Sequence, residues 1–139
     1  MTISQMARTE VVTVTPDTVA TEVSEVLEEE NVGSVVVVEG DEPVGIITDR
    51  DLALQVVGED VLADEVTAAE LMSEDLFTVQ DDEIIYDVLA AMDEAGVRRV
   101  PVLDGDELVG IVTLDDFLVL LTSELDHVSG VVQSGVPEY

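Results

Sequence analysis

The chain repeats itself, and this repeat constrains its fold more than any other feature. The segment Gly45–Leu52 (GIITDRDL) aligns with Gly110–Phe117 (GIVTLDDF), which begins 65 positions later. The same offset, without a gap, places Gly40-Asp41-Glu42 over Gly105-Asp106-Glu107. A constant offset that holds along the chain is the signature of an internal duplication. The sequence therefore predicts two copies of one small structural unit.

Each copy is predicted to contain a strand, a helix, two strands joined by a tight turn, and a closing helix. In the first copy, Val19, Val23 and Leu27 have the spacing of one helix face, and the run of valines from Val35 to Val38 predicts a strand covered on both faces. We expect strands at 11–14, 34–38 and 44–48, matched by strands at 76–79 and 100–103, closing helices over 49–57 and 114–125, and a short helix at 68–72.

The predicted fold class is α+β, similar to α/β, with two βαββα repeats related by pseudo-two-fold symmetry and sheets packed against helices. A unit of about 60 residues is marginally stable alone, so both repeats are expected to share one body. Along the chain we assign residues 1–60 to the first repeat, 61–72 to a linker with a short helix, 73–125 to the second repeat, and 126–139 to a C-terminal tail without firm structure.

The charge of the chain is extreme, because 33 acidic residues face four arginines and no lysine, for a net charge of −29. Nucleic-acid binding requires clusters of Lys and Arg against the phosphates, so nucleic acid is excluded as a partner, and an anionic membrane would repel the chain. The carboxylates are spread along the whole sequence. This spread favours a solvated surface adapted to concentrated salt over a metal or cationic-partner site, and it predicts a halophile's cytoplasm.

Enzyme chemistry is not expected from this composition. There is no cysteine, which excludes disulfides and zinc–thiolate sites. The single histidine, His127, has no second imidazole for a catalytic triad. Acidic pairs such as Asp81-Asp82 lie where helices begin, so we assign no metal site, no catalytic cofactor and no catalytic residue. Neither a signal peptide nor an apolar run of about 18 residues is present, so a soluble, cytoplasmic protein is expected.

The repeated strings resemble a known family. Two Gly-Ile-x-Thr-x-x-Asp segments, with Val100-Pro101-Val102 after a turn at Gly96, are similar to the CBS domains, named after cystathionine β-synthase, which occur as tandem pairs called Bateman modules. The resemblance covers roughly residues 4–121. It implies a regulatory module that binds AMP, ADP, ATP or S-adenosylmethionine between its repeats, forms a disc-shaped homodimer through its helices, and signals to an effector protein that the sequence does not identify.

The motif residues themselves suit a nucleotide. A Thr at the end of a strand and an Asp three residues later face the same side of a strand–helix junction. There the carboxylate can accept hydrogen bonds from a ribose diol, and the hydroxyl and free helix amides can meet a phosphate. Thr48 with Asp51 and Thr113 with Asp116 are therefore candidates. The alternative is that each pair caps its closing helix.

The adjacent Arg98 and Arg99 are the candidate phosphate ligands. They stand just before a predicted strand in a chain that contains no lysine, and the positions that match them carry the basic phosphate-binding residues in nucleotide-binding relatives. An Arg–phosphate contact contributes about 1.5–3 kcal/mol. The alternative is that the pair forms surface ion pairs with acids such as Asp93 or Glu94, which contribute only about 0–1 kcal/mol.

The resemblance implies two unequal clefts. One combines Thr113, Asp116, Arg98 and Arg99 with Thr9 and the backbone near Val32. The other combines Thr48, Asp51 and Arg50 with Glu74 and the backbone near Val97. The first repeat carries Gly33-Ser34 where the second carries its arginines, so we expect one good site, although Asp115 beside Asp116 repels an anion. The alternative function is a structural or interaction module whose clefts are vestigial.

Overall fold

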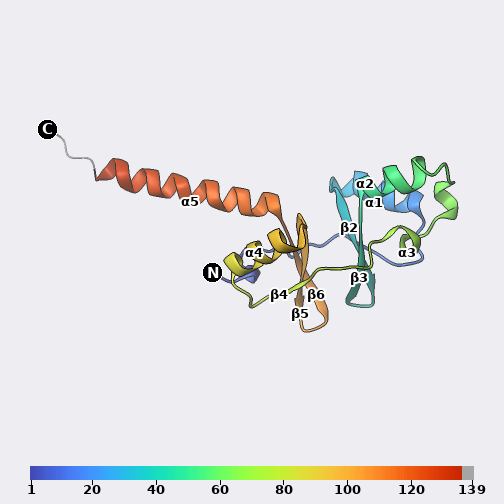
Figure 1. The fold of residues 1–139 in the computed structure, drawn as a ribbon, viewed down its shortest axis with the longest axis horizontal. Helices are drawn as coiled ribbons and strands as arrows, with labels where there is room; N and C mark the ends of the chain where they lie inside the picture. The colour runs from blue at the N-terminus through green and yellow to red at the C-terminus, as the bar shows by residue number, and fades with distance from the viewer. Residues whose placement is uncertain (136–139) are drawn as a thin grey trace.

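The computed structural model describes residues 1–135 and contains two similar α+β units side by side (Figure 1). The first is built from β1 (Thr13–Val14), α1 (Ala20–Glu30), β2 (Ser34–Glu39), β3 (Glu42–Thr48) and α2 (Asp49–Leu52), which continues into the π-helical segment η2 (Ala53–Val57). The second is built from β4 (Val79–Gln80), α4 (Ile85–Ala95), β5 (Arg99–Asp104), β6 (Glu107–Thr113) and α5 (Leu114–Ser134). Three short helical segments complete the chain: η1 (Ile3–Gln5), η3 (Ala63–Glu65) and α3 (Ala68–Leu71).

Both sheets have the same topology. In the first, β1 pairs parallel with β2, and β2 pairs antiparallel with β3. In the second, β4, β5 and β6 repeat this order. Equivalent residues occupy equivalent pairs, as when Val35 faces Ile47 and Val100 faces Val112. The predicted pair of βαββα repeats is therefore confirmed.

The first strand of each repeat is shorter than predicted. The strand expected at 11–14 is formed only by Thr13 and Val14, and the one expected at 76–79 begins at Val79. The preceding residues Val11, Val12, Leu76 and Phe77 instead line a cleft between the repeats. These residues are apolar, and their pattern predicted a strand. In the structure they form part of the cleft wall instead.

Each repeat has its own apolar core. The valine run behaves as predicted, because Val35, Val36 and Val37 are all fully buried. Helix α1 contributes Val23 and Leu27 to this first core, and α4 contributes the matching Val88 and Met92 to the second. The sheet of each repeat is thus packed against its helices.

The N-terminal segment of each repeat packs on the other repeat. Ile3 of η1 is fully buried in the second core, and Arg8 forms a β-bridge with Ile111 of β6. The equivalent segment of the second repeat packs on the first repeat. Leu71 of α3 is buried in the first core, and Ser73 forms a β-bridge with Ile46 of β3. This exchange interlocks the two repeats, because the core of each one includes a side chain from the N-terminal segment of the other.

The glycine that opens each motif allows this exchange. A Cβ atom built on Gly45 would lie 2.5–2.8 Å from side-chain atoms of Met72, and one built on Gly110 would lie 3.0 Å from the carbonyl oxygen of Arg8. Real Cβ atoms essentially never come closer than 3.0 Å to another atom, and a distance of 3.0 Å is itself tighter than nine in ten real Cβ contacts. The first position of the Gly-Ile-x-Thr motif is therefore glycine because the exchanged segment crosses directly over it.

Helix α5 is longer than predicted and projects from the body (Figure 1). The closing helix was expected to end near Leu125, yet it continues to Ser134. The turn residues Gly130, Gly135 and Pro137 had indicated an irregular tail, but an isolated glycine is tolerated within a helix. Residues 136–139 of that predicted tail lie outside the described part of the chain. Within residues 1–135, no helix is both long enough and apolar enough to cross a membrane.

Candidate functional site

A cleft of about 740 Å³ lies between the two repeats. Its walls come from equivalent positions of both: Ile46 with Ile111 from the sheets, Thr48 with Thr113 at the strand ends, and Val32 with Val97. A cleft of this volume is within the range of about 300–1,000 Å³ that is usual for small-molecule sites. This cleft thus takes residues from both repeats, and it includes residues that the resemblance assigned to two separate clefts.

All four arginines of the chain line this cleft, and the chain has no lysine. These residues are Arg8, Arg50, Arg98 and Arg99. The lining also includes four carboxylates, so its net charge is near zero, whereas the whole chain carries −29. Because an anion is repelled elsewhere on such a surface, this cleft is the place where negative charge is tolerated best.

Arg98 and Arg99 stand where β5 begins. The Arg98 carbonyl oxygen accepts a hydrogen bond of 2.8 Å from the amide of Leu114, the first residue of α5. Arg99 pairs with Thr113 in the sheet, and its Nη1 donates a long contact of 3.5 Å to the Gly33 carbonyl oxygen of the other repeat. Among residues 1–135, neither arginine forms an ion pair with a carboxylate, so the alternative pairing with Asp93 or Glu94 is not observed.

The two Thr–Asp pairs form helix caps. Asp51 Oδ2 accepts from the Thr48 amide at 2.8 Å, and Thr48 Oγ1 accepts in return from the Asp51 amide at 3.2 Å. Asp116 Oδ2 accepts from the Thr113 amide at 2.9 Å in the equivalent arrangement. These reciprocal bonds are the capping box that satisfies free amides at a helix start. Capping is therefore one role of both pairs, and the two Thr residues also line the cleft.

Arg8 is the site residue that sequence reasoning missed. Its Nε and Nη2 donate to the same oxygen, Asp116 Oδ1, at 3.0 and 2.9 Å. Within the described residues this is the single ion pair, despite the many acids of the chain. One signal was available, since Arg8 is among only four cationic side chains that the sequence contains.

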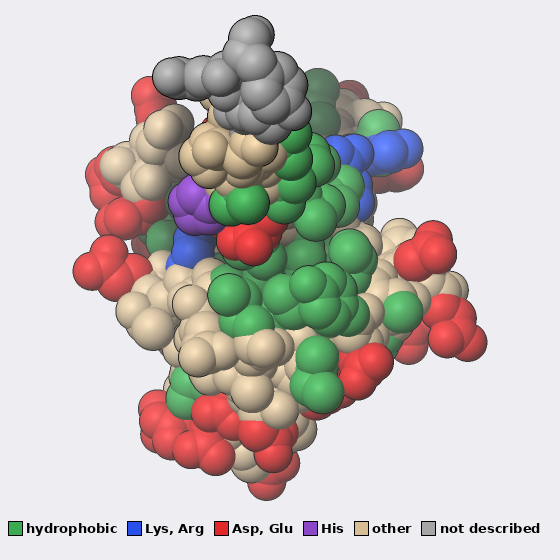
Figure 2. Space-filling model, turned by 90° about the vertical axis from the view of Figure 1, so that its left-hand side faces the viewer, with side chains coloured by type: hydrophobic (Ala, Val, Ile, Leu, Met, Phe, Trp, Pro, Cys, Tyr) green, Lys and Arg blue, Asp and Glu red, His purple; other side chains and the backbone are tan. Residues whose placement is uncertain are grey.

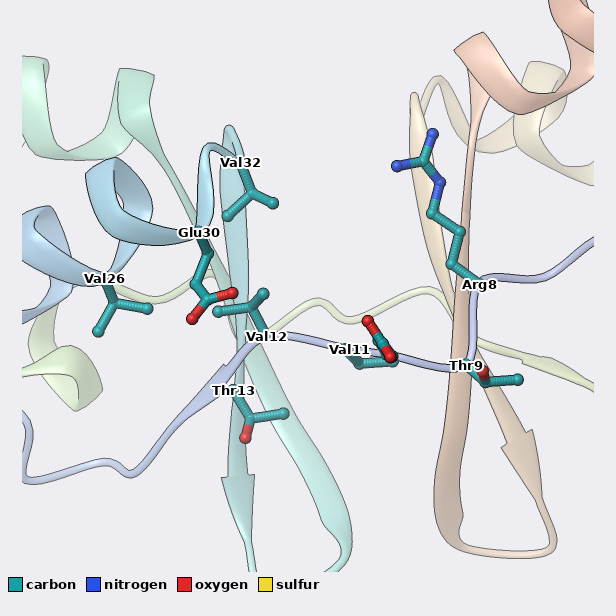
Figure 3. Close-up of a pocket in the computed structure, with 9 residues that line it drawn as sticks. Arg8, Thr9, Val11, Val12, Thr13, Val26, Glu30 and Val32 are labelled. Atoms are coloured by element: carbon teal, nitrogen blue, oxygen red, sulfur yellow. The ribbon is translucent and has the colours of Figure 1, made fainter.

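A second hollow of about 760 Å³ adjoins the cleft and shares Arg8, Val11 and Val32 with it. Figure 3 shows Val32 and Glu30 on the first repeat, Arg8 beside the second, and the segment through Val11 crossing between them. Thr9, predicted to lie near the ligand, lines this second hollow.

The predicted site residues are only partly brought together. Seven of them line the cleft: Val32, Thr48, Arg50, Val97, Arg98, Arg99 and Thr113. Asp51, Asp116 and Glu74 line neither of the two hollows. Asp51 and Asp116 instead accept hydrogen bonds from the backbone amides of Thr48 and Thr113 at the helix starts. Asp116 also forms an ion pair with Arg8. Three of the four arginines are attached to the second repeat near Thr113: Arg98 and Arg99 lie at the start of β5, and Arg8 is bridged to β6 and paired with Asp116.

Apolar side chains form the rest of the cleft wall: Val11, Val12, Leu76, Phe77 and Pro101. A wall of this kind suits a planar base, which buries its faces against apolar groups and leaves its edges for hydrogen bonds. In the part of the chain that the structure describes, no three or more His, Asp or Glu side chains come together as a metal site. The arrangement fits a ligand with one flat apolar part and one anionic part.

Comparison with known proteins places both repeats in one family, because residues 3–58 and 68–123 match the CBS domain. Protein MK0525 of Methanopyrus kandleri is 40% identical over 120 residues, which cover 85% of this chain and 61% of that protein. The chain thus spans less than two thirds of that relative. A protein with CBS domains from Burkholderia ambifaria has a similar structure, with a TM-score of 0.80 at 27% identity over 88% of this chain and 95% of the other.

A further neighbour was solved with ligands. The CBS domain pair of protein MJ0100, in complex with 5′-methylthioadenosine and S-adenosyl-L-methionine, has a TM-score of 0.80 and 25% identity over 89% of this chain and 98% of the other. The family match covers both repeats, and both structures share the fold of most of this chain, with TM-scores of 0.80. The chain therefore belongs to the CBS domain family, as a tandem pair of CBS domains.

Proposed function

We propose that this CBS pair is a regulatory module that binds a phosphate-bearing adenosine derivative, such as AMP, ADP or ATP, in the cleft between its repeats. The observation that carries the proposal is the gathering of all four arginines at that cleft. The ligand-bound neighbour supports an adenosine compound as the ligand class. We assign no catalytic role to the module.

The arginines suit phosphates better than S-adenosylmethionine. Guanidinium groups form charge-assisted, often bidentate bonds with phosphate oxygens. S-adenosylmethionine offers these arginines a single carboxylate and also carries a positive sulfonium and a positive ammonium, whereas a phosphate chain offers several anionic oxygens. Three of the arginines, Arg50, Arg98 and Arg99, have no carboxylate partner within residues 1–135, and they are therefore available to a ligand.

The half of the cleft beside Thr113 is the proposed phosphate side. Arg98 and Arg99 belong to this half, and Arg8 is bridged to β6 next to it. The equivalent half beside Thr48 has Gly33, Ser34 and Ser73 at the corresponding positions and retains only Arg50. The ligand's base is proposed to lie against the apolar wall.

Binding without catalysis acts through linkage to a partner. A ligand that contacts both repeats stabilises one relative orientation of them, and a protein that recognises this orientation is coupled to the ligand by the same free energy. The interlocked segments near Arg8 and Ser73 give each repeat a direct connection to the other. We propose an effector protein as the receiver of this signal and a homodimer as the working unit.

The acidic surface is proposed to be an adaptation to a salt-rich cytoplasm. The whole chain has 33 carboxylates. The part that the structure describes contains one ion pair, so most of its acids are solvated rather than paired. At about 1 M salt the Debye length is about 3 Å, so their mutual repulsion is largely screened. Ligand binding should therefore be measured in concentrated KCl.

Calorimetric titration of AMP, ADP, ATP and S-adenosylmethionine into the folded chain tests the proposal. We expect saturable binding of a phosphate-bearing ligand near one per chain. Arg99→Ala should weaken it about tenfold or more, since a lost charge-assisted bond contributes about 1.5–3 kcal/mol. Arg50→Ala is the matched variant, because it removes the same charge from the poorer half and should weaken binding less.

A change of net charge alone must be separated from the loss of a contact. Ser24 is exposed on α1 and lines neither hollow, so Ser24→Glu makes the chain more negative by one unit without touching the site, and its affinity should match that of the wild type. Preference for S-adenosylmethionine with no effect of Arg99→Ala would overturn the phosphate assignment. No binding at millimolar ligand by a folded chain would favour the interaction module with vestigial clefts.

A further inference from the structure

Asp116 uses both of its carboxylate oxygens within the chain. Oδ2 accepts hydrogen bonds from the Thr113 amide at 2.9 Å and from the Thr113 hydroxyl at 3.1 Å. Oδ1 accepts from Nε and Nη2 of Arg8 at 3.0 and 2.9 Å. An ionised carboxylate has about four acceptor sites, so these hydrogen bonds occupy all of them. Asp116 therefore has no acceptor left for a hydroxyl group of a ligand.

The equivalent carboxylate of the first repeat is not saturated in this way. Asp51 Oδ2 accepts from the Thr48 amide, but among residues 1–135 no hydrogen bond reaches Asp51 Oδ1. The difference comes from one position, because Ser73 stands 65 positions after Arg8 and is its equivalent in the other N-terminal segment. A serine side chain is too short for the contact that the guanidinium makes. The saturation of Asp116 is therefore due to Arg8 and not to the repeated motif.

Arg8 stands between Asp116 and the cleft. Arg8 lines both hollows, whereas Asp116 lines neither, and the Asp116 side chain is only 12% exposed. Figure 3 shows the side chain of Arg8 extending from its segment along β6 toward α5, where Asp116 lies. A sugar bound in the cleft on this side therefore meets the guanidinium before it meets the carboxylate.

Arg8 can bind a phosphate without leaving Asp116. A guanidinium has five N–H donors, and the two contacts with Oδ1 leave three of them for another oxygen. If Arg8 turned away, Asp116 and its neighbour Asp115 would both stand uncompensated beside the anionic part of the ligand. Other cations are scarce, as the few blue side chains among the red acids in Figure 2 show. A bound phosphate therefore favours this ion pair, although an exposed ion pair is weak by itself.

We propose that Arg8 makes this module indifferent to the ribose hydroxyls of its nucleotide. The inference rests on the proposed function and concerns the half of the cleft beside Thr113. The motif suggested Asp116 as the acceptor for a ribose diol, but its acceptor sites are held by Thr113 and Arg8. Asp116 is then a positioning residue that holds Arg8, and the ligand is selected by its phosphates and its base. Ribonucleotides and deoxyribonucleotides are accepted alike.

Calorimetry with ATP, 2′-deoxy-ATP and 3′-deoxy-ATP in concentrated KCl tests this selectivity. The wild type should bind all three with dissociation constants within about twofold of one another. A hydroxyl that donates to a carboxylate contributes about tenfold, so a tenfold loss on removal of either hydroxyl would overturn the inference while leaving the proposed function intact. Absence of binding by all three to a folded chain would overturn the proposed function, and the inference with it.

Two variants separate the position of Arg8 from its charge. Arg8→Ala frees Oδ1 of Asp116, so ATP should now bind about tenfold more tightly than its deoxy analogues, although all three bind more weakly than to the wild type. Ser24→Glu changes the net charge by the same one unit away from both hollows and should keep the wild-type ratios. Equal binding of the three nucleotides to Arg8→Ala would show that Arg8 does not withhold Asp116, and this would overturn the assignment.

A change at Asp116 itself gives an independent measurement. Asp116→Asn retains a side-chain oxygen that can cap the helix but removes the charge that holds Arg8. It should therefore weaken all three nucleotides by the same factor, and circular dichroism checks that the fold is kept. A loss of affinity for ATP alone, without a loss for the deoxy analogues, would mean that Asp116 contacts the ribose and would overturn the inference.

Discussion

Arg8 Nη2 lies 2.9 Å from Asp116 Oδ1, and this contact joins the beginning of the chain to the start of its last helix. Arg8 belongs to the segment that is bridged to β6, and Asp116 belongs to the first turn of α5. The other oxygen of Asp116 caps that helix. One carboxylate therefore ties together the exchanged segment, the motif of the second repeat and a cleft arginine.

Replacement of Arg8 by alanine should affect the ligand more than the fold. The Arg8 side chain is 63% exposed, so its ion pair contributes at most about 1 kcal/mol to the free energy of unfolding, and less in concentrated salt. As a cationic group of the proposed phosphate side, it should contribute about tenfold to ATP affinity. Urea unfolding and calorimetry measure the two quantities. A loss of several kcal/mol of stability with unchanged affinity would show that Arg8 is only structural.

The two caps form a matched pair of sites for mutation. Asp51→Ala and Asp116→Ala each remove a capping box and should each lower the free energy of unfolding by about 1 kcal/mol. Nucleotide affinity should fall in Asp116→Ala, because Arg8 then loses the carboxylate that holds its guanidinium in place beside the cleft, and it should change little in Asp51→Ala. Equal losses of affinity in both variants would contradict the proposal that the phosphate binds in the half of the cleft beside Thr113.

Replacement of Gly45, the first glycine of the motif in the first repeat, should disturb the packing against Met72. In Gly45→Ala the new methyl group would meet Met72 at 2.5–2.8 Å, and such overpacking costs about 1–3 kcal/mol. The cost should be smaller when Met72→Ala is already present, since the Cγ and Sδ atoms that crowd the site are then absent. A double-mutant cycle by urea unfolding measures this coupling. Additive effects would mean that Met72 moves aside freely.

Salt should stabilise the fold. Raising KCl from 0.1 M to 1 M shortens the Debye length from about 10 Å to about 3 Å, which weakens the repulsion among carboxylates that remain unpaired in the described residues. The melting temperature is expected to rise over this range. Sucrose, which excludes itself from surfaces without screening charge, is the control and should not reproduce the full effect. A melting temperature independent of KCl would contradict the proposed adaptation.

Most of the fold could be predicted from local patterns. The repeated Gly-Ile-x-Thr-x-x-Asp strings identified the duplication, and the helical spacing of Val19, Val23 and Leu27 placed α1 correctly. Gly96 was expected to end a helix, and it does so with a φ of +69°. The end of α5 was predicted wrongly, because Gly130 and Gly135 are turn signals locally, while the continuing apolar spacing maintains the helix.

The sequence by itself determined the two repeats, their strands and helices, and the scarcity of cations that made Arg98 and Arg99 candidates. These properties depend on neighbours along the chain and on composition, which can be read without coordinates. The tertiary structure alone decided that the N-terminal segment packs on the second repeat, and hence that Arg8 meets Asp116, 108 positions away. Such a contact depends on which of two equivalent surfaces each segment covers, and two repeats of the same topology offer both surfaces.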